Sequence, residues 1–229
     1  MFKLCKAILA ESTIAVLTVF FAFSSIIAWV FPYPLRYRWI TLWSTCVIAI
    51  EHYFWNIKVE IKGLENIPNY PCILIANHQS MWETLYFQKL FTYQTWVLKQ
   101  ELLWIPFFGW GLKLLDPIAI DRKKTFGIRN ISKAVADRLA KNRWVVIFPE
   151  GTRCPPDKPK RFSKSAAFTA AQLNVPVLLV KHDAGKCWPK GAFIKKGGTI
   201  TVTISQPLMP PYHNTDALHE QIVAWFTTH

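Results

Sequence analysis

The chain has 229 residues, of which 52% are hydrophobic, and carries a formal net charge of +13. This length fits one catalytic domain with a small appendage. A basic, aromatic-rich composition indicates an anionic partner, either a membrane surface or a nucleic acid. The five cysteines form no CxxC pair, which argues against a disulfide framework and a zinc site and favours a reducing compartment.

Two apolar segments open the chain. Residues 12–31 carry no charge and are numerous enough to cross a bilayer or to lie deep within it; a cleaved signal peptide is the alternative. Residues 39–55 include a glutamate and a histidine and form a poorer span, and Pro32 and Pro34 between the segments predict a tight turn. Because basic residues flank the first segment on both sides, we expect residues 1–56 to form a helical hairpin that enters one leaflet and returns.

The remainder, residues 57–229, is expected to form one domain in which strands alternate with helices. Apolar runs and alternating patterns predict strands at 57–61, 72–76, 95–99, 118–120, 144–148, 175–180 and 199–205. Helical patterns follow several of them, at about 80–90, 125–142, 163–173 and 216–227. This order predicts the α/β class, with a mixed, mainly parallel sheet flanked by helices.

A polar turn follows the 72–76 strand. Ser80 and Glu83 have the spacing of a capping box at the start of a helix. His78 precedes that helix, so the carboxylate of Glu83 can reach back to its imidazole. A carboxylate that fixes the tautomer of a histidine and stabilises its charged form makes it a competent general base. The alternative is a plain helix cap beside an ordinary loop histidine.

A second polar turn follows the 144–148 strand, and in α/β sheets ligands bind at such strand ends. Arg153 in this turn can grip a phosphate with two hydrogen bonds, and Gly151 lets the backbone approach it. Lys99 and Arg122 also follow predicted strands, so several cations can converge on one cleft. The alternative is an ordinary turn with a solvated arginine. The sequence has no GxSxG, HExxH, Walker or GxGxxG motif, so hydrolase, zinc-protease and nucleotide-binding functions lack support.

Four blocks in this order resemble a known family: Asn77-His78-Gln79-Ser80 with an acid at 83, Lys99-Gln100-Glu101-Leu102 with Ile105-Pro106 and Gly109, Phe148-Pro149-Glu150-Gly151-Thr152-Arg153, and Val175-Pro176-Val177. Together they resemble the glycerolipid acyltransferases, most closely the bacterial 1-acylglycerol-3-phosphate acyltransferases, over roughly residues 58–206. The resemblance implies transfer of a fatty acyl group from a thioester to lysophosphatidate, which yields phosphatidate. It also implies a two-helix membrane anchor.

The resemblance implies roles for individual residues. His78 matches the catalytic histidine, and Glu83 stands where the family usually has an aspartate. The implied phosphate-binding residues are Lys99, Glu150, Gly151, Thr152 and Arg153. The implied partners are membrane lipids, lysophosphatidate and an acyl donor, either acyl-CoA or acyl-carrier protein, and no nucleic acid, metal or cofactor is expected.

The expected location is the inner (cytoplasmic) membrane, with the catalytic domain in the cytoplasm. Two alternatives to this function stay open at the level of the sequence. One is acyl transfer to another lysophospholipid or to glycerol 3-phosphate. The other is a membrane-tethered basic module that binds anionic lipids without catalysis.

Overall fold

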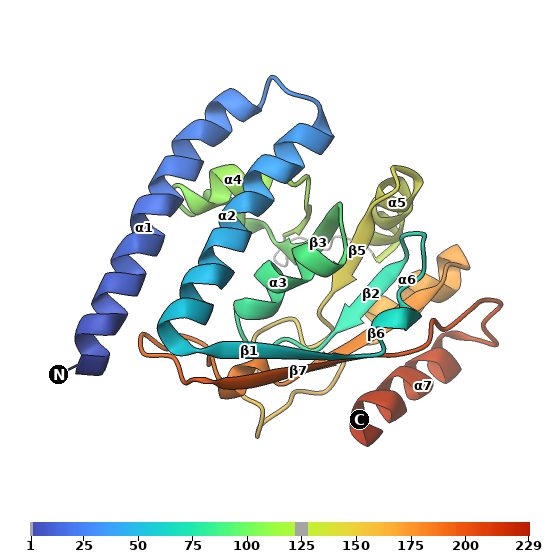
Figure 1. Ribbon diagram of the computed structural model, residues 1–229. Coiled ribbons are helices and arrows are strands. Elements are labelled where there is room, and N and C mark those ends of the chain that lie inside the picture. Colours follow the sequence, from blue (N-terminus) through green and yellow to red (C-terminus); the bar gives the residue numbers. More distant parts are fainter. Residues whose placement is uncertain (1, 122–127) are drawn as a thin grey trace.

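The computed structural model describes residues 2–121 and 128–229 (Figure 1). Its α-helices are α1 (Phe2–Ala28), α2 (Tyr33–Trp55), α3 (Trp82–Leu90), α4 (Phe108–Leu114), α5 (Ile128–Ala140), α6 (Ser165–Leu173) and α7 (Thr215–Thr228). Its strands are β1 (Ile57–Lys62), β2 (Ile73–Ala76), β3 (Gln94–Lys99), β4 (Ile118–Ile120), β5 (Trp144–Ile147), β6 (Val177–His182) and β7 (Gly198–Ile204). Short 3-10 helices are η1 (Leu64–Asn66), η2 (Gln100–Trp104) and η3 (Ala184–Lys186).

The seven strands form one sheet in the order β1-β7-β6-β2-β5-β3-β4. Neighbouring strands are parallel except β6 and β7, which pair antiparallel. The predicted α/β fold with a mixed, mainly parallel sheet is therefore confirmed. Because β2, β5 and β3 are parallel neighbours, the turns that follow them open at the same edge of the sheet.

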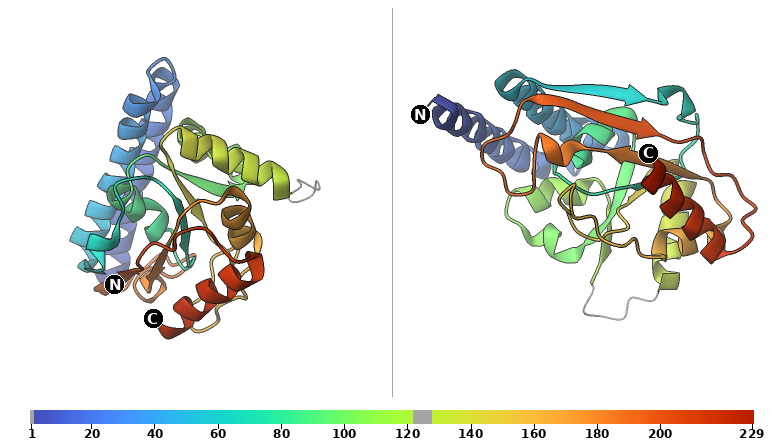
Figure 2. Two further views of the ribbon diagram at one scale, coloured as in Figure 1. Left: turned by 90° about the vertical axis from the view of Figure 1, so that its right-hand side faces the viewer. Right: turned by 90° about the horizontal axis from the view of Figure 1, so that it is seen from below.

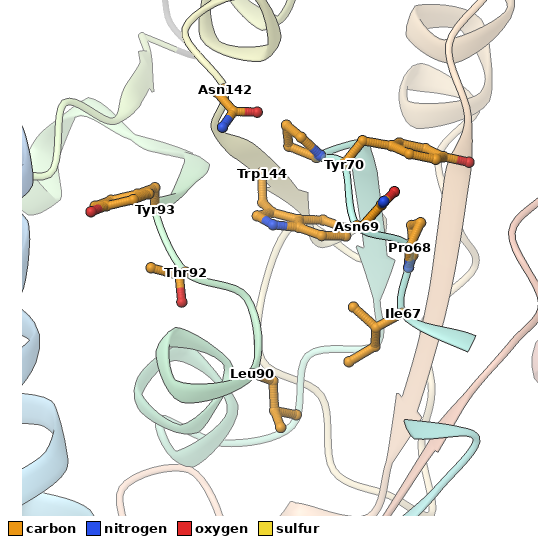
Figure 3. A pocket seen from close by; sticks show the side chains of 10 residues that line it. Ile67, Pro68, Asn69, Tyr70, Leu90, Thr92, Tyr93, Asn142 and Trp144 are labelled. Atoms are coloured by element: carbon orange, nitrogen blue, oxygen red, sulfur yellow. The ribbon is translucent and has the colours of Figure 1, made fainter. Parts of the chain in front are cut away.

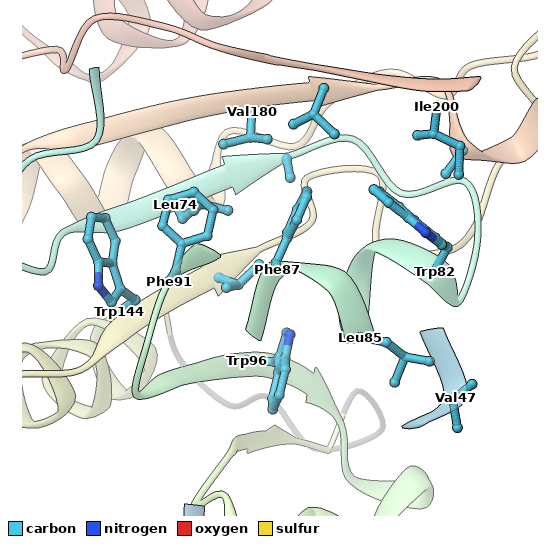
Figure 4. Close-up of a cluster of buried hydrophobic side chains, with 14 of the residues drawn as sticks. Val47, Leu74, Trp82, Leu85, Phe87, Phe91, Trp96, Trp144, Val180 and Ile200 are labelled. Carbon is cyan, nitrogen blue, oxygen red and sulfur yellow. The ribbon is translucent and has the colours of Figure 1, made fainter. Parts of the chain in front are cut away.

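Helices cover both faces of the sheet (Figure 2). On β2, Leu74 and Ala76 face a core shared with the hairpin and α3, whereas Ile73 and Ile75 face a second core shared with α5, α6 and α7. This alternation follows from the two-residue period of a strand. Continuous apolar strands are expected when both faces are covered in this way. Figure 4 shows the first core, where aromatic side chains of α3 lie against the sheet.

The two N-terminal helices form an antiparallel hairpin, as the sequence predicts (Figure 1). Trp39 and Trp43 of α2 donate indole hydrogen bonds to Ser24 and Thr18 of α1, at 2.9 and 3.0 Å. Helix α2 in turn packs on α3, with a 3.0 Å hydrogen bond from Ser44. The hairpin thus rests directly on the domain that follows it. Division of the chain into an anchor, 1–56, and a separate domain, 57–229, stays a prediction.

The hairpin leaves many large apolar side chains exposed, among them Phe2, Val16, Phe20, Phe23, Ile26, Ile27, Trp29, Val30 and Leu35. Among the described residues, α1 is the one helix that is both long and apolar enough to cross a membrane, judged by length and composition. A water-soluble protein rarely leaves so much contiguous apolar surface unpartnered. The exposed face is thus suited to contact with lipid.

Candidate active site

The polar turn after β2 brings His78 against Glu83. Nδ1 of His78 lies 2.7 Å from Oε1 of Glu83. Helix α3 begins at Trp82. Oγ of Ser80 accepts the amide of Trp82 at 3.1 Å and the carboxylate of Glu83 accepts the amide of Ser80 at 2.9 Å, as expected when Ser80 caps the helix. Residues 79–81 separate His78 from the first residue of the helix, so the side chain of Glu83 can point back to the imidazole.

Glu83 serves as a cap and as the partner of His78 at the same time. Its side chain is fully buried, and its carboxylate accepts the backbone amides of Gln79 and Ser80, each at 2.9 Å. Burial acts to raise the pKa of Glu83, but the neighbouring imidazoles of His182 and His78 and the Ser80 amide outweigh it and hold that pKa below its usual range. Glu83 is therefore an ionised carboxylate inside the fold.

The imidazole of His78 is held in a defined orientation. Because Glu83 is ionised, it accepts a hydrogen bond from Nδ1 of His78, and Nδ1 therefore carries the proton. The lone pair of Nε2 is then able to accept a proton. The ring stacks on Phe148, with centroids 4.2 Å apart and planes inclined by 16°. Since 18% of the side chain is exposed, His78 can reach a bound molecule.

The turn after β5 is fastened to the histidine turn. The carboxylate of Glu150 accepts the backbone amide of His78 at 3.2 Å, and the amide of Cys154 donates to the His78 carbonyl at 2.8 Å. Gly151 between them has φ +66°, the left-handed conformation that favours glycine. The sequence did not indicate the contact of Glu150 with His78. Burial raises the pKa of Glu150 to about 7.

A cavity of about 940 Å³ opens beside His78. Lys99 and Arg153 lie on its wall, together with Glu150, Gly151 and Thr152, so the structure brings all the predicted site residues except the buried Glu83 to one cavity, and Glu83 contacts His78. Among the described residues, neither Lys99 nor Arg153 forms a salt bridge. Arg122, the other predicted cation, lies outside the described residues.

Much of the remaining cavity wall is apolar. This apolar part comes from the hairpin, η2, α4 and the residues next to them: Phe21, Ala22, Ile40, Trp43, Leu102, Ile105, Phe107, Phe108, Gly111, Leu112 and Leu115. One cavity therefore joins an imidazole that can act as a base, the three cations Lys99, Arg153 and Lys190, and a space suited to a hydrocarbon chain. The sequence predicted His78, Lys99 and Arg153 at one site, but not Lys190 and not that the hairpin closes the cavity.

Sequence reasoning also missed His182. It lies at the end of β6, two residues beyond the strand predicted for 175–180, and its ring is fully buried 3.8 Å from Glu83. A single histidine after an apolar strand gives no signal of its own. Its significance depends on the pairing of β6 with β2, which residue spacing along the chain does not reveal.

A second, smaller pocket of about 290 Å³ lies at the other end of the sheet, between the segment before β2 and the start of β5 (Figure 3). Tyr70, Tyr93 and Trp144 line it with neutral neighbours, and its described lining contains no carboxylate, imidazole or amine. It therefore lacks the groups that acid–base chemistry requires. Within residues 2–121 and 128–229, no three or more His, Cys, Asp or Glu side chains are grouped so as to hold a metal ion.

Residues 58–182 match the family model described as Acyltransferase. The chain is 42% identical over 189 residues to the 1-acyl-sn-glycerol-3-phosphate acyltransferase of Pseudomonas aeruginosa, a match that covers 79% of this chain and 71% of that protein. It is 28% identical to the enzyme of that name from Saccharomyces cerevisiae, over 80% of this chain and 61% of the relative.

The same fold occurs in the crystal structure of the 1-acyl-sn-glycerophosphate acyltransferase PlsC from Thermotoga maritima. The two structures superimpose with a TM-score of 0.79 over 99% of this chain and 94% of the other. Their sequences are 21% identical, so this likeness concerns the fold alone.

Proposed function

This chain belongs to the acyltransferase family, and from that premise we propose that it transfers a fatty acyl group from a thioester to the free hydroxyl of lysophosphatidate, which yields phosphatidate. The observation that carries the proposal is one cavity whose lining contains His78, Lys99 and Arg153 as well as a large apolar part. To react, lysophosphatidate needs a base for its hydroxyl, cations for its phosphate and an apolar space for its acyl chain. The acyl donor also carries a fatty acyl chain and needs apolar space for it.

His78 is assigned the role of general base. A glycerol hydroxyl is a weak nucleophile at neutral pH, and Nε2 of His78 takes its proton as the oxygen attacks the thioester carbonyl. Such a base contributes roughly 10²- to 10⁴-fold to the rate. Glu83, hydrogen-bonded to Nδ1 at 2.7 Å, stabilises the imidazolium that forms. The proton then passes to the departing thiolate.

Lys99 and Arg153 are assigned to the acceptor phosphate, together with the backbone of Gly151 and the hydroxyl of Thr152. A phosphate monoester carries about −1.5 to −2 charges near neutral pH, and both cations lie on the cavity wall without a salt bridge among the described residues. Fixing the phosphate aims the hydroxyl at His78, which lowers the entropic part of the barrier. The carboxylate of Glu150 repels an anion when ionised, so its contribution is to hold the turn of His78.

The donor is assigned as acyl-CoA or acyl-carrier protein. A thioester is already activated towards attack, and the acceptor itself is the nucleophile. The reaction therefore requires neither a cofactor nor a metal ion, and the chain's own residues supply the base and the anion site.

We place the hairpin in one leaflet of the inner (cytoplasmic) membrane, with the catalytic domain in the cytoplasm. The exposed apolar side chains of α1 and of the turn after it support this placement. The hairpin also lines the cavity, so an acyl chain can pass from lipid into the site. Cysteine labelling of residue 5 or 6 from the cytoplasmic side, in sealed vesicles, tests it. Labelling from the opposite side alone would place the N-terminus across the membrane and contradict the proposal.

Product analysis with the purified full chain tests the reaction. Lysophosphatidate with either donor is expected to give phosphatidate, and His78→Ala is expected to give none while keeping the wild-type circular dichroism spectrum. Glycerol 3-phosphate and lysophosphatidylethanolamine serve as competing acceptors. Preferred acylation of either would replace the proposed acceptor. Binding of anionic lipid without any product would identify a non-catalytic module.

A further inference from the structure

His182 lies against the catalytic turn, in contact with Asn77. It ends β6, which pairs with β2 in the sheet. Its fully buried ring lies against two aromatic rings of α3, with centroids 6.2 Å from Trp82 and 5.8 Å from Phe87. His182 is not among the residues that line the cavity, so it acts on a substrate only through other residues.

The hydrogen bonds of the ring define its tautomer. The backbone amide of Ala184 donates to Nδ1 of His182 at 3.2 Å, so Nδ1 carries no proton. Nε2 therefore carries it and donates to the carbonyl of Asn77 at 2.8 Å. Burial lowers the pKa of His182 and favours this neutral form.

The peptide unit that joins Asn77 to His78 is consequently held from both sides. Its carbonyl accepts from Nε2 of His182, and its amide donates to the Glu150 carboxylate at 3.2 Å. The side chain of Asn77 is fixed as well, since it accepts the amide of His182 at 2.9 Å and donates to its carbonyl at 2.8 Å. Two adjacent strands are thus clamped together at the residue that immediately precedes the base.

The same N–H group also faces the dyad. Nε2 of His182 lies 3.8 Å from Oε1 of Glu83, too far for a hydrogen bond but close enough for its positive end to favour an ionised carboxylate. The titratable groups that face this ring are Glu83, His78 and Asp183. All of them belong to the catalytic turns or to the end of β6.

We infer that His182 is a positioning residue, which orients His78 through the Asn77–His78 peptide and favours the ionised form of Glu83. The inference rests on the proposed acyl transfer, in which His78 is the base. A displacement of a catalytic group by about 1 Å can lower the reaction rate on the order of 10²-fold. A neutral imidazole suits this place, because it donates to one side, accepts from the other and adds no charge to the core.

Two variants of His182 separate its donor from its acceptor. The amide nitrogen of His182→Gln reaches the place of Nε2 and can donate to Asn77, whereas the shorter His182→Asn reaches only the place of Nδ1 and can accept from Ala184. We expect His182→Asn to lose roughly 10²-fold in kcat with an unchanged KM for lysophosphatidate. His182→Gln should recover most of that loss. Equal kcat in both variants and the wild type would overturn the inference.

The pH–rate profile tests the electrostatic part. Without the positive end of the His182 N–H beside it, the still ionised Glu83 holds the His78 imidazolium more tightly, so the acid limb of the His182→Asn profile is expected at higher pH than in the wild type. A purely structural role would lower the amount of folded protein and leave the limb in place. Thermal unfolding of both variants reports that amount, and an unshifted limb in well-folded His182→Asn would contradict the inference.

The tautomer can be tested in the wild-type chain, so the test does not depend on variants that fold. Nitrogen-15 NMR of histidine-labelled protein in micelles should show His182 neutral near pH 7, with the proton on Nε2. A proton on Nδ1, or a doubly protonated ring, would overturn the inference. This measurement is independent of turnover: failure to make phosphatidate would refute the proposed function, whereas a wrong tautomer would refute the inference alone.

Discussion

Lys195, in the connection between β6 and β7, lies 3.2 Å from the carboxylate of Glu51 in α2. It also pairs with Glu11 of α1, and its amine lies 5.0 Å from the ring centre of Trp188. Lys195 is 4% exposed and Glu51 is 1% exposed. The glutamate that makes residues 39–55 a poor membrane span therefore has a buried partner in the catalytic domain, and this ion pair fastens the base of the hairpin.

Removing that lysine should loosen the molecule. Lys195→Met leaves the buried Glu51 and the partly exposed Glu11 without their cation, and loss of one partner of a buried ion pair costs about 3–5 kcal/mol. Denaturant unfolding in micelles is expected to show a destabilisation of that order. Lys196→Met, at the exposed neighbouring position, is the control and should change little. A stable Lys195→Met protein would mean that the pair is not needed to dock the hairpin.

Glu83→Gln should separate the charge of the carboxylate from its size. A neutral amide stabilises an imidazolium poorly, so acyl transfer is expected to fall by about 10²-fold or more. Stability should fall too, because Glu83 is fully buried and accepts two backbone amides, whereas glutamine offers one acceptor oxygen. Glu83→Asp keeps the charge and should retain part of the activity. Near-normal turnover of folded Glu83→Gln would show that His78 works without this partner.

The proximity of these two residues could be predicted from the sequence because it is local. His78 and Glu83 are five residues apart, and a turn between a strand and a helix brings them together whatever the rest of the fold does. The strands were predictable for a related reason. Continuous apolar runs such as 72–76 and 144–148 are buried on both faces, and that burial leaves a direct pattern in the residues.

Contacts over long distances in the chain could not be predicted in this way. His182 meets Asn77 across 105 residues, which requires knowledge that β6 lies next to β2. The contact of Glu150 with His78 spans 72 residues. Similarly, the cavity wall depends on how α1 and α4 pack, and the aromatic side chains there have no periodic pattern that distinguishes a cavity lining from lipid contact.

Arg153→Ala should weaken use of an anionic acceptor. Loss of a charge-assisted hydrogen bond worth about 1.5–3 kcal/mol corresponds to roughly 10- to 100-fold in kcat/KM for lysophosphatidate. Monoacylglycerol, which has no phosphate, should lose far less. Arg161→Ala, exposed in the loop that follows, is the control. Equal losses on both acceptors would assign Arg153 to the fold rather than to the phosphate.

Glu150 should make stability depend on pH. Burial raises its pKa from 4.5 to about 7 in the folded chain, so between these values the folded state binds more protons than the unfolded state. The free energy of unfolding should therefore decrease as pH rises from about 4.5 to about 7. Glu150→Gln, which cannot ionise, should remove that part of the decrease. If the free energy of unfolding falls equally with pH in Glu150→Gln and in the wild type, the raised pKa of Glu150 is contradicted.

Gly111 should control the length of the acyl chain that fits. It lies on the cavity wall, and a Cβ atom there would meet Ile40 at 3.7 Å, an ordinary contact. Gly111→Ala should therefore be tolerated, whereas Gly111→Leu should fill part of the cavity and shift donor preference to shorter chains. Each methylene that no longer fits forfeits about 0.8 kcal/mol. Competition between donors of different length measures the shift, and an unaltered preference in Gly111→Leu would place the chain elsewhere.

The part played by the hairpin in the cavity wall has a consequence for how such enzymes diversify. Thr18, Phe21, Ile40 and Trp43 belong to the two helices of the hairpin, and they line the cavity next to His78. A chimaera that exchanges residues 1–56 with those of a relative would therefore transplant fatty-acid selectivity while leaving His78 and Glu83 untouched. Under the proposed function, such an exchange alters which fatty acids enter the phospholipids and keeps the residues assigned to acyl transfer.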